Sequence, residues 1–166
     1  MLDGGVEFEF DTTFPSSFFR GFTIPVIQDD GMLSASAFDF KEFDGRGMQE
    51  CSVNWNDDAG SLLQIAAQEK GNGQKQFKFG ACRIPRAEID RARVLVAAMT
   101  AELSYERKPV EGNPYHGNLL CKTELSPSGK KALCGMLAMS YDLLYTREEL
   151  DQICSGSIEE AGVHHR

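Results

Sequence analysis

The residue best suited to take part in a reaction is His116, in the segment Gly112–Leu120. Pro114 fixes a turn before it, and Gly117 permits a second bend after it, so the imidazole stands at the mouth of a short apolar strand. An imidazole held in this way can act as a general acid or base. It can also pin the loop to a backbone carbonyl. The sequence favours the pinning role, because His116 has no evident catalytic partner.

Arg20 is the second residue to consider, because it lies among aromatic residues in a strand predicted over Phe18–Ile24. The planar guanidinium of an arginine can hold an anion through two parallel hydrogen bonds. It can also pair with one of the 25 acidic residues of the chain. The sequence favours this ion pair.

Other polar residues share a predicted position on turns or interior strands rather than on exposed helices. They are Ser34, Ser36, Ser52, Asn54 and Asn113. We therefore predict a site in which His116 is the catalytic residue, while Arg20 and these residues bind a ligand or anion. The prediction requires that they converge in the folded chain.

The sequence contains no complete cofactor or metal motif. Gly45-Arg46-Gly47 lacks the rest of a phosphate-binding loop, and neither a Gly-x-Ser-x-Gly elbow nor an HExxH helix occurs. The five cysteines match no CxxC spacing, so we expect buried thiols rather than a zinc or redox site. We predict no cofactor and no metal, and give a metal role of His164-His165 little weight.

The net charge of −8 and a pI near 4.9 restrict the partners of the chain. Nucleic acids and anionic membranes select cationic surfaces, so both are disfavoured. The charge permits simple solubility or a protein partner with a basic surface. No oligomeric state is predicted.

Nothing in the sequence indicates a membrane segment. No apolar run approaches the ~20 residues of a spanning helix, and Met1–Glu7 lacks the basic and apolar regions of a signal peptide. We expect a cytoplasmic protein.

The alternation of short apolar runs predicts an α+β fold in a single domain over residues 1–154, with a frayed tail over 155–166. We expect a curved, mainly antiparallel sheet of about five to seven strands. Two main helices, near 57–70 and 127–145, are expected to pack on it. A capping box at Thr146–Glu149 predicts a further short helix that ends near Cys154.

Strands are predicted where apolar residues alternate with polar ones or form short runs. They are Val6–Phe10, Phe18–Ile24, Met32–Phe40, Glu50–Trp55, Gln76–Ile84 and Leu119–Cys121. Residues 94–99 and 101–108 are expected to form one long strand or two, after a short turn or helix at 85–90. Asn56–Asp58 is expected to cap the first main helix.

Four motifs in order resemble a set of small uncharacterised bacterial proteins with the pattern Arg…SSxAF…SVN/D…NPxHA. The motifs are Arg20, Ser34-Ala35-Ser36-Ala37-Phe38, Ser52-Val53-Asn54 and Asn113-Pro114-Tyr115-His116. The resemblance covers about residues 18–145 and departs at Gly117, where the pattern has alanine. It implies one folded unit that includes His116, and no reaction type. Some such proteins look like accessory parts of conflict or defence loci.

Two functions follow as hypotheses. The favoured one is an interaction or accessory protein that binds a basic partner, because the chain is acidic and lacks a complete catalytic motif. The alternative is an enzyme, a transferase or hydrolase, acting on a nucleotide or similar anion. In it Arg20 would hold the phosphate, Ser34 or Ser36 would orient the ligand, and His116 would move a proton. An arginine strand followed by a Ser-x-Ser strand also faintly resembles ADP-ribosyltransferase-like folds, but no later acidic residue can be matched.

Overall fold

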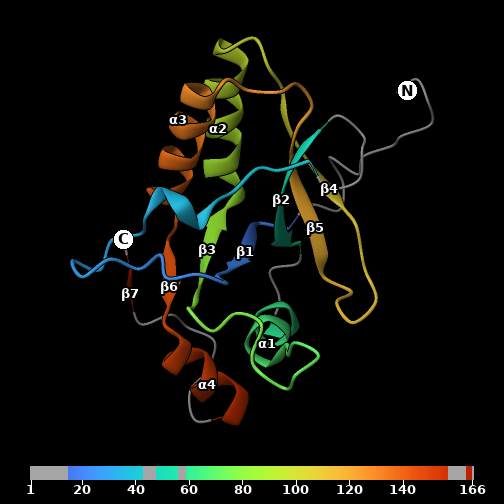
Figure 1. The fold of residues 1–166 in the computed structure, drawn as a ribbon, viewed down its shortest axis with the longest axis vertical. Coiled ribbons are helices and arrows are strands. Elements are labelled where there is room, and N and C mark those ends of the chain that lie inside the picture. Colours follow the sequence, from blue (N-terminus) through green and yellow to red (C-terminus); the bar gives the residue numbers. More distant parts are fainter. Residues whose placement is uncertain (1–14, 43–47, 56–58, 157–163, 166) are drawn as a thin grey trace.

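An open antiparallel sheet with the strand order β4-β5-β2-β1-β3-β6-β7 forms the centre of the fold (Figure 1). The structure, a computed structural model, describes residues 15–42, 48–55, 59–156 and 164–165. The strands are β1 (Ser17–Gly21), β2 (Gln49–Asn54), β3 (Ala81–Pro85), β4 (Leu103–Arg107), β5 (His116–Cys121), β6 (Leu143–Tyr145) and the two-residue β7 (His164–His165). The predicted α+β class and antiparallel sheet are confirmed.

Four α-helices accompany the sheet in the described part of the chain. They are α1 (Ala59–Ala67), α2 (Arg86–Ala98), α3 (Pro127–Ala138) and α4 (Arg147–Ser155). A 3-10 helix, η2, spans Ala35–Ala37. Figure 1 shows α2 and α3 side by side at one end of the sheet, and α1 and α4 toward the other end.

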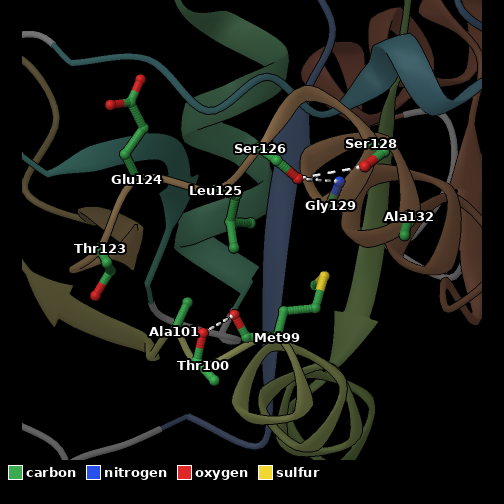
Figure 2. A pocket seen from close by; sticks show the side chains of 10 residues that line it. All are labelled: Met99, Thr100, Ala101, Thr123, Glu124, Leu125, Ser126, Ser128, Gly129 and Ala132. Atoms are coloured by element: carbon green, nitrogen blue, oxygen red, sulfur yellow. Dashed lines mark hydrogen bonds between the residues drawn. The ribbon is translucent and has the colours of Figure 1, made fainter.

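The starts of α3 and α4 follow the capping chemistry predicted from the sequence. The Ser126 hydroxyl accepts a hydrogen bond from the Gly129 N–H at 3.1 Å, with Pro127 in the first turn (Figure 2). At α4, the Thr146 hydroxyl accepts from the Glu149 N–H, and the Glu149 carboxylate accepts from the Thr146 N–H. This is the predicted capping box.

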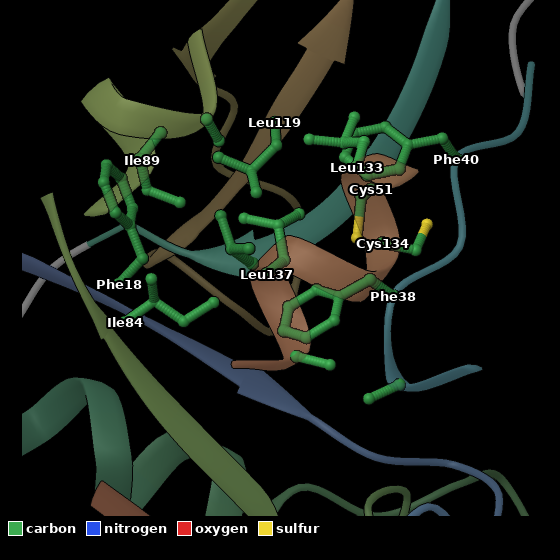
Figure 3. Close-up of a cluster of buried hydrophobic side chains, with 14 of the residues drawn as sticks. Phe18, Phe38, Phe40, Cys51, Ile84, Ile89, Leu119, Leu133, Cys134 and Leu137 are labelled. Carbon is green, nitrogen blue, oxygen red and sulfur yellow. The ribbon is translucent and has the colours of Figure 1, made fainter. Parts of the chain in front are cut away.

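The sheet separates two hydrophobic cores, because successive residues of a strand face opposite sides. Phe18 of β1 lies in the larger core with Leu133 of α3 (Figure 3). Phe19, the next residue, lies in the smaller core with Leu62 of α1 and Leu150 of α4. Each such burial stabilises the fold by about 1.5–3 kcal/mol. The strand β1 therefore belongs to both cores.

The prediction of a strand over residues 94–99 is wrong, since they lie at the end of α2 or just beyond it. The buried residues Ile89, Ala92 and Val96 recur at helical spacing, while Val94 is 71% exposed. Ion pairs between residues three positions apart, such as Arg91 with Glu88, form on the solvent-facing side of α2 and are typical of a helix. A short apolar run alone does not distinguish a strand from a helix.

The second main helix is shorter than predicted, because α3 ends at Ala138 and residues 143–145 form β6. Leu143 and Tyr145 belong to the smaller core, and Leu144 belongs to the larger one. This alternation is that of a strand. The helical spacing of Leu137, Tyr141 and Leu144 in the sequence is a coincidence.

Two other predicted strands are replaced in whole or part by turns. The segment 32–40 contains η2, because the Ser34 side chain accepts from the Ser36 N–H and caps a helical turn. In the segment 76–84 only residues from Ala81 onward are extended, since Gly80 has φ +110° and breaks the run. The predicted strand at Val6–Phe10 and the cap at 56–58 lie outside the described residues.

Across the described ranges, no helix combines the length and the apolar character that a membrane span needs.

Candidate functional site

The sheet opens between β1 and β2. Only one residue pair, Phe19 with Asn54, joins these strands, whereas β1 and β3 are paired along five residues. Further along β2, Glu50 exchanges both backbone hydrogen bonds with Lys41 instead of with β1. We call the gap that opens between β1 from Arg20 onward and the middle of β2 the sheet fork.

The side chain of Arg20 fills the sheet fork. In an antiparallel strand, alternate residues turn their backbone groups to the same side. The Ser52 carbonyl therefore points into the fork, between the paired residues Glu50 and Asn54. Arg20 Nη1 donates to this carbonyl at 2.7 Å, and Arg20 Nε donates to the Ala37 carbonyl at 3.0 Å. The guanidinium thus takes the place of missing ladder hydrogen bonds.

A cavity of about 500 Å³ lies at the sheet fork, and we call it the fork cavity. It brings together five of the seven residues predicted from the sequence, namely Arg20, Ser52, Asn54, Asn113 and His116. It also contains residues that the sequence did not indicate, chiefly Asp39, Lys41, Ile65, Gln68, Gln76, Phe77 and Val110. The volume of the fork cavity is within the usual range of small-molecule sites, about 300–1,000 Å³.

The remaining two candidates, Ser34 and Ser36, do not line the fork cavity. Their hydroxyls bond to one another at 2.8 Å, and Ser34 caps η2. Their place in the structure is therefore the turn that carries Ala37, whose carbonyl holds Arg20.

Asn54 and Asn113 build the wall of the fork cavity by bonding to each other. The Asn113 Nδ2 donates to Asn54 Oδ1 at 2.9 Å, and the Asn54 Nδ2 donates to the Ser61 carbonyl of α1 at 3.0 Å. The Tyr115 N–H donates to Asn113 Oδ1. Both amides are at most 5% exposed. They fix α1 and the loop before His116 to the end of β2.

His116 combines an anchoring bond with an available nitrogen. Its Nδ1 lies 2.8 Å from the Lys108 carbonyl, which can only accept, so Nδ1 carries the proton and Nε2 is the acceptor. This is the loop-pinning bond predicted from the sequence. Among the described residues nothing bonds to Nε2.

The environment keeps this imidazole neutral. Burial lowers the pKa of His116, the hydrogen bond to the Lys108 carbonyl opposes it, the Lys108 charge adds to the lowering, and the Glu106 charge opposes it. At neutral pH the ring therefore has an unprotonated Nε2 in the wall of the fork cavity. Such a nitrogen can accept a hydrogen bond or a proton.

Arg20 does not form the ion pair that the sequence favoured. Within the described ranges its only hydrogen bonds go to two backbone carbonyls, and no carboxylate pairs with it. Two of the five guanidinium N–H groups are used, so three are available in the cavity. The neighbouring cation Lys41 pairs with Asp39 at 2.9 Å, and both are exposed.

Arg147 fixes the wall of the fork cavity that faces α1. Its Nη1 donates to the Phe77 carbonyl at 3.0 Å, and its Nη2 donates to the Ala66 carbonyl of α1 at 2.7 Å. An ion pair with Asp151, one turn later in α4, orients the guanidinium. The sequence indicated the cap of α4 but not this contact, which joins segments far apart in the chain.

A row of buried polar residues lies beside the site on the same face of the sheet. The Asn118 Nδ2 donates to Glu50 Oε1 at 2.9 Å and to Glu106 Oε1 at 3.2 Å. All three residues are at most 6% exposed. Because Glu106 pairs with Asn118 and Asn118 is two residues from His116, this row places negative charge close to the imidazole.

A second cavity, of about 390 Å³, lies at the start of α3 (Figure 2). Two of its hydroxyls bond within the protein: Ser126 Oγ accepts from the Gly129 N–H, and Thr100 Oγ1 donates to the Met99 carbonyl. Glu124 is the single titratable residue in its described lining. It offers less chemistry than the fork cavity.

Three of the buried cysteines have thiols that resist deprotonation. Burial raises the pKa of Cys121 to about 12 and that of Cys134 to about 11, and it raises the pKa of Cys82 further. Within the described ranges all five cysteines are free, and no group of three potential ligands could hold a metal ion.

Comparison with models of protein families, with curated proteins and with solved structures gives no significant match. The resemblance to small bacterial proteins therefore stays a prediction.

Proposed function

We propose that the fork cavity binds a small anionic ligand and that His116 accepts a proton or hydrogen bond from it. The observation that carries the proposal is Arg20, a half-buried cation in the cavity with no carboxylate partner among the described residues. Burying a charge is unfavourable unless hydrogen bonds or an opposite charge compensate it. An anionic ligand would supply both through the three available N–H groups.

The state of His116 supports a role in proton transfer. A neutral imidazole whose Nδ1–H is held by a carbonyl presents Nε2 in one fixed direction. When a ligand hydroxyl or a bound water within hydrogen-bond distance of Nε2 attacks an electrophilic atom of the ligand, Nε2 would accept the proton that this oxygen releases. This arrangement fits an enzyme, a transferase or hydrolase, acting on a nucleotide or similar anion.

The test is a thermal-shift series with phosphate, nucleoside monophosphates and NAD at constant ionic strength. We expect at least one anion to raise the melting temperature of the wild-type protein. His116→Asn should reduce the shift, because asparagine keeps a donor near the Lys108 carbonyl and removes Nε2. Arg20→Gln should abolish the shift.

Arg91→Gln is the matched control for Arg20→Gln. Arg91 is exposed on α2, outside the fork cavity, and its loss also removes one positive charge. Equal loss of binding in both variants would show that the loss in Arg20→Gln comes from the change in net charge and not from a contact in the cavity. A series without any shift in the wild-type protein would contradict the proposal.

The acidic surface favours a second candidate function, an accessory protein that binds a basic partner. The net charge is −8. The exposed acids Asp29, Glu42, Glu111 and Glu124 form no ion pair in the described part of the chain. These acids lie outside the fork cavity, so the two functions are compatible.

Affinity capture from the native host at about 50 mM and about 500 mM salt tests this second function. A partner held by charge should bind at the lower salt concentration and dissociate at the higher one. Failure to capture any partner at either concentration would contradict it.

A further inference from the structure

We propose that the ligand of the fork cavity carries an aromatic heterocycle, which stacks on Phe77 while its phosphate lies at Arg20; the ligand class is a nucleotide. The inference rests on the function proposed above and adds the part of the ligand that is not an anion.

The ring of Phe77 is a flat surface held in a fixed position. Its Cγ and Cδ1 atoms lie 2.5 Å from the point that a Cβ atom on Gly21 would occupy. The ring therefore packs directly on the backbone of β1, where a side chain at position 21 would displace it. Arg147 holds the Phe77 carbonyl and α1 together, so the wall behind the ring is braced. A rigid aromatic surface loses little entropy when a ligand ring stacks on it.

Apolar side chains accompany Phe77 in this half of the cavity. Ile65 of α1 belongs to the smaller core, against which Phe77 packs; it is 1% exposed and lines the cavity from the helix. Val110, 44% exposed, lies on the loop that Gln64 ties to α1 through the Gly112 carbonyl. Apolar groups on several sides suit a flat ring better than a phosphate or a hydrated sugar.

Two amide side chains provide polar contacts for the edge of the ring. Gln68 and Gln76 both line the cavity, and the Gln76 N–H donates to the Gln68 carbonyl at 2.8 Å. The side-chain amide of Gln76 and the Nε2 of Gln68 bond to no other described residue. An amide offers a donor and an acceptor together, which matches the paired donors and acceptors on the edge of a nucleobase.

The chemistry of the cavity is thus divided between two parts. The guanidinium of Arg20 and the Ser52 residue lie at the sheet fork, where a phosphate would be held. Phe77 and the two glutamine amides lie on the segments beside α1, where a base would stack. A ligand with one anionic end and one aromatic end satisfies both parts.

The test compares the binding of the four common nucleoside monophosphates with that of ribose 5-phosphate by isothermal titration calorimetry. We expect at least one nucleotide to bind about 10-fold or more tightly than ribose 5-phosphate, since base stacking on an aromatic side chain supplies that factor. Phe77→Leu should remove the difference and leave ribose 5-phosphate binding unchanged. Phe77→Tyr keeps the ring and should retain the preference.

Phe79→Leu is the control, because Phe79 packs against the larger core and does not line the cavity. It should leave both affinities unchanged. Ribose 5-phosphate that binds as tightly as every nucleotide would overturn the inference and leave the proposed anion site intact. Binding of none of the phosphate compounds would overturn the anion site and the inference with it.

Discussion

The two sides of β1 are built differently. Toward β3 the strand has a complete ladder of five residue pairs, whereas toward β2 it has one. On the first side backbone pairs with backbone, and a single arrangement satisfies every group. On the second side a guanidinium, a turn and a loop complete the hydrogen bonding, and a cavity remains. The candidate site therefore lies where regular pairing ends.

Truncating Phe18, the β1 residue that faces the larger core, should have the largest effect. Phe18 is fully buried, and its ring lies 5.4 Å from Trp55 and 5.5 Å from Tyr105. We expect Phe18→Ala to lower the free energy of unfolding by about 3–5 kcal/mol. Urea denaturation measures it. A loss below about 1 kcal/mol would show that this core relaxes around the cavity.

Adding a methyl group at Gly21, which lines the fork cavity, should have the next largest effect. Gly21→Ala places a methyl group in the space of the Phe77 ring, 2.5 Å from its carbon atoms. We expect a loss of about 1–3 kcal/mol from overpacking, together with displacement of Phe77 and weaker ligand binding. Denaturation and calorimetry check the two parts. Gly135→Ala, at a helical position with nothing near the added methyl group, is the control and should not destabilise the protein.

Removing the Arg20 side chain, which bridges the sheet fork, should lower stability by a similar amount. Arg20→Ala leaves the Ala37 and Ser52 carbonyls without their donor, which we expect to lower stability by about 1–3 kcal/mol. Arg20→Gln can keep one of the two bonds and should lose less. Equal stability of all three proteins in denaturant would show that water replaces the guanidinium without penalty.

The pH dependence of stability should distinguish the imidazole from the fold around it. The folded protein has a lowered pKa at His116, so below a pH of about 6.5 the unfolded chain binds more protons at this residue than the folded one. Stability should therefore fall as the pH falls through this window. His116→Asn removes the group, and its stability should fall less over the same range. Parallel curves for the two proteins in thermal melts would contradict the lowered pKa.

The smallest effect concerns the reactivity of the cysteine thiols, including Cys82 on β3, where the pairing of β1 is complete. Cys82 pairs with Arg20 across β1 and β3, is fully buried and has a raised pKa. We expect iodoacetamide at a pH of about 8 to modify Cys154, the one cysteine of intermediate burial, long before the four buried ones. Mass spectrometry of the intact protein counts the adducts. Early labelling of Cys82 would show that the paired side of β1 opens as readily as the fork.

The sequence predicted the elements with strong local chemistry. The cap at Ser126, the capping box at Thr146 and the apolar run of β2 all formed as expected. The turn before His116 was also predicted, together with its bond to a carbonyl. In each case the residues that decide the structure lie within a few positions of one another.

The parts that could not be predicted depend on residues far apart in the chain. The partners of Arg20 are backbone carbonyls 17 and 32 residues away, and no residue type indicates a carbonyl. Phe77 enters the site because it packs on Gly21, and the sequence between them shows nothing of this contact. The later part of α2 was missed for a different reason, since Val94-Leu95-Val96 suits a strand in isolation.

The brace formed by Arg147 has a consequence for synthesis on the ribosome. Arg20, Ser52 and Phe77 emerge early, but the guanidinium that ties Phe77 to α1 emerges 70 residues after Phe77. A nascent chain can pair β1 with β3 and still lack a finished wall around the cavity. The wall that Phe77 and α1 form around the fork cavity is therefore completed late in translation, after the strands that flank the cavity.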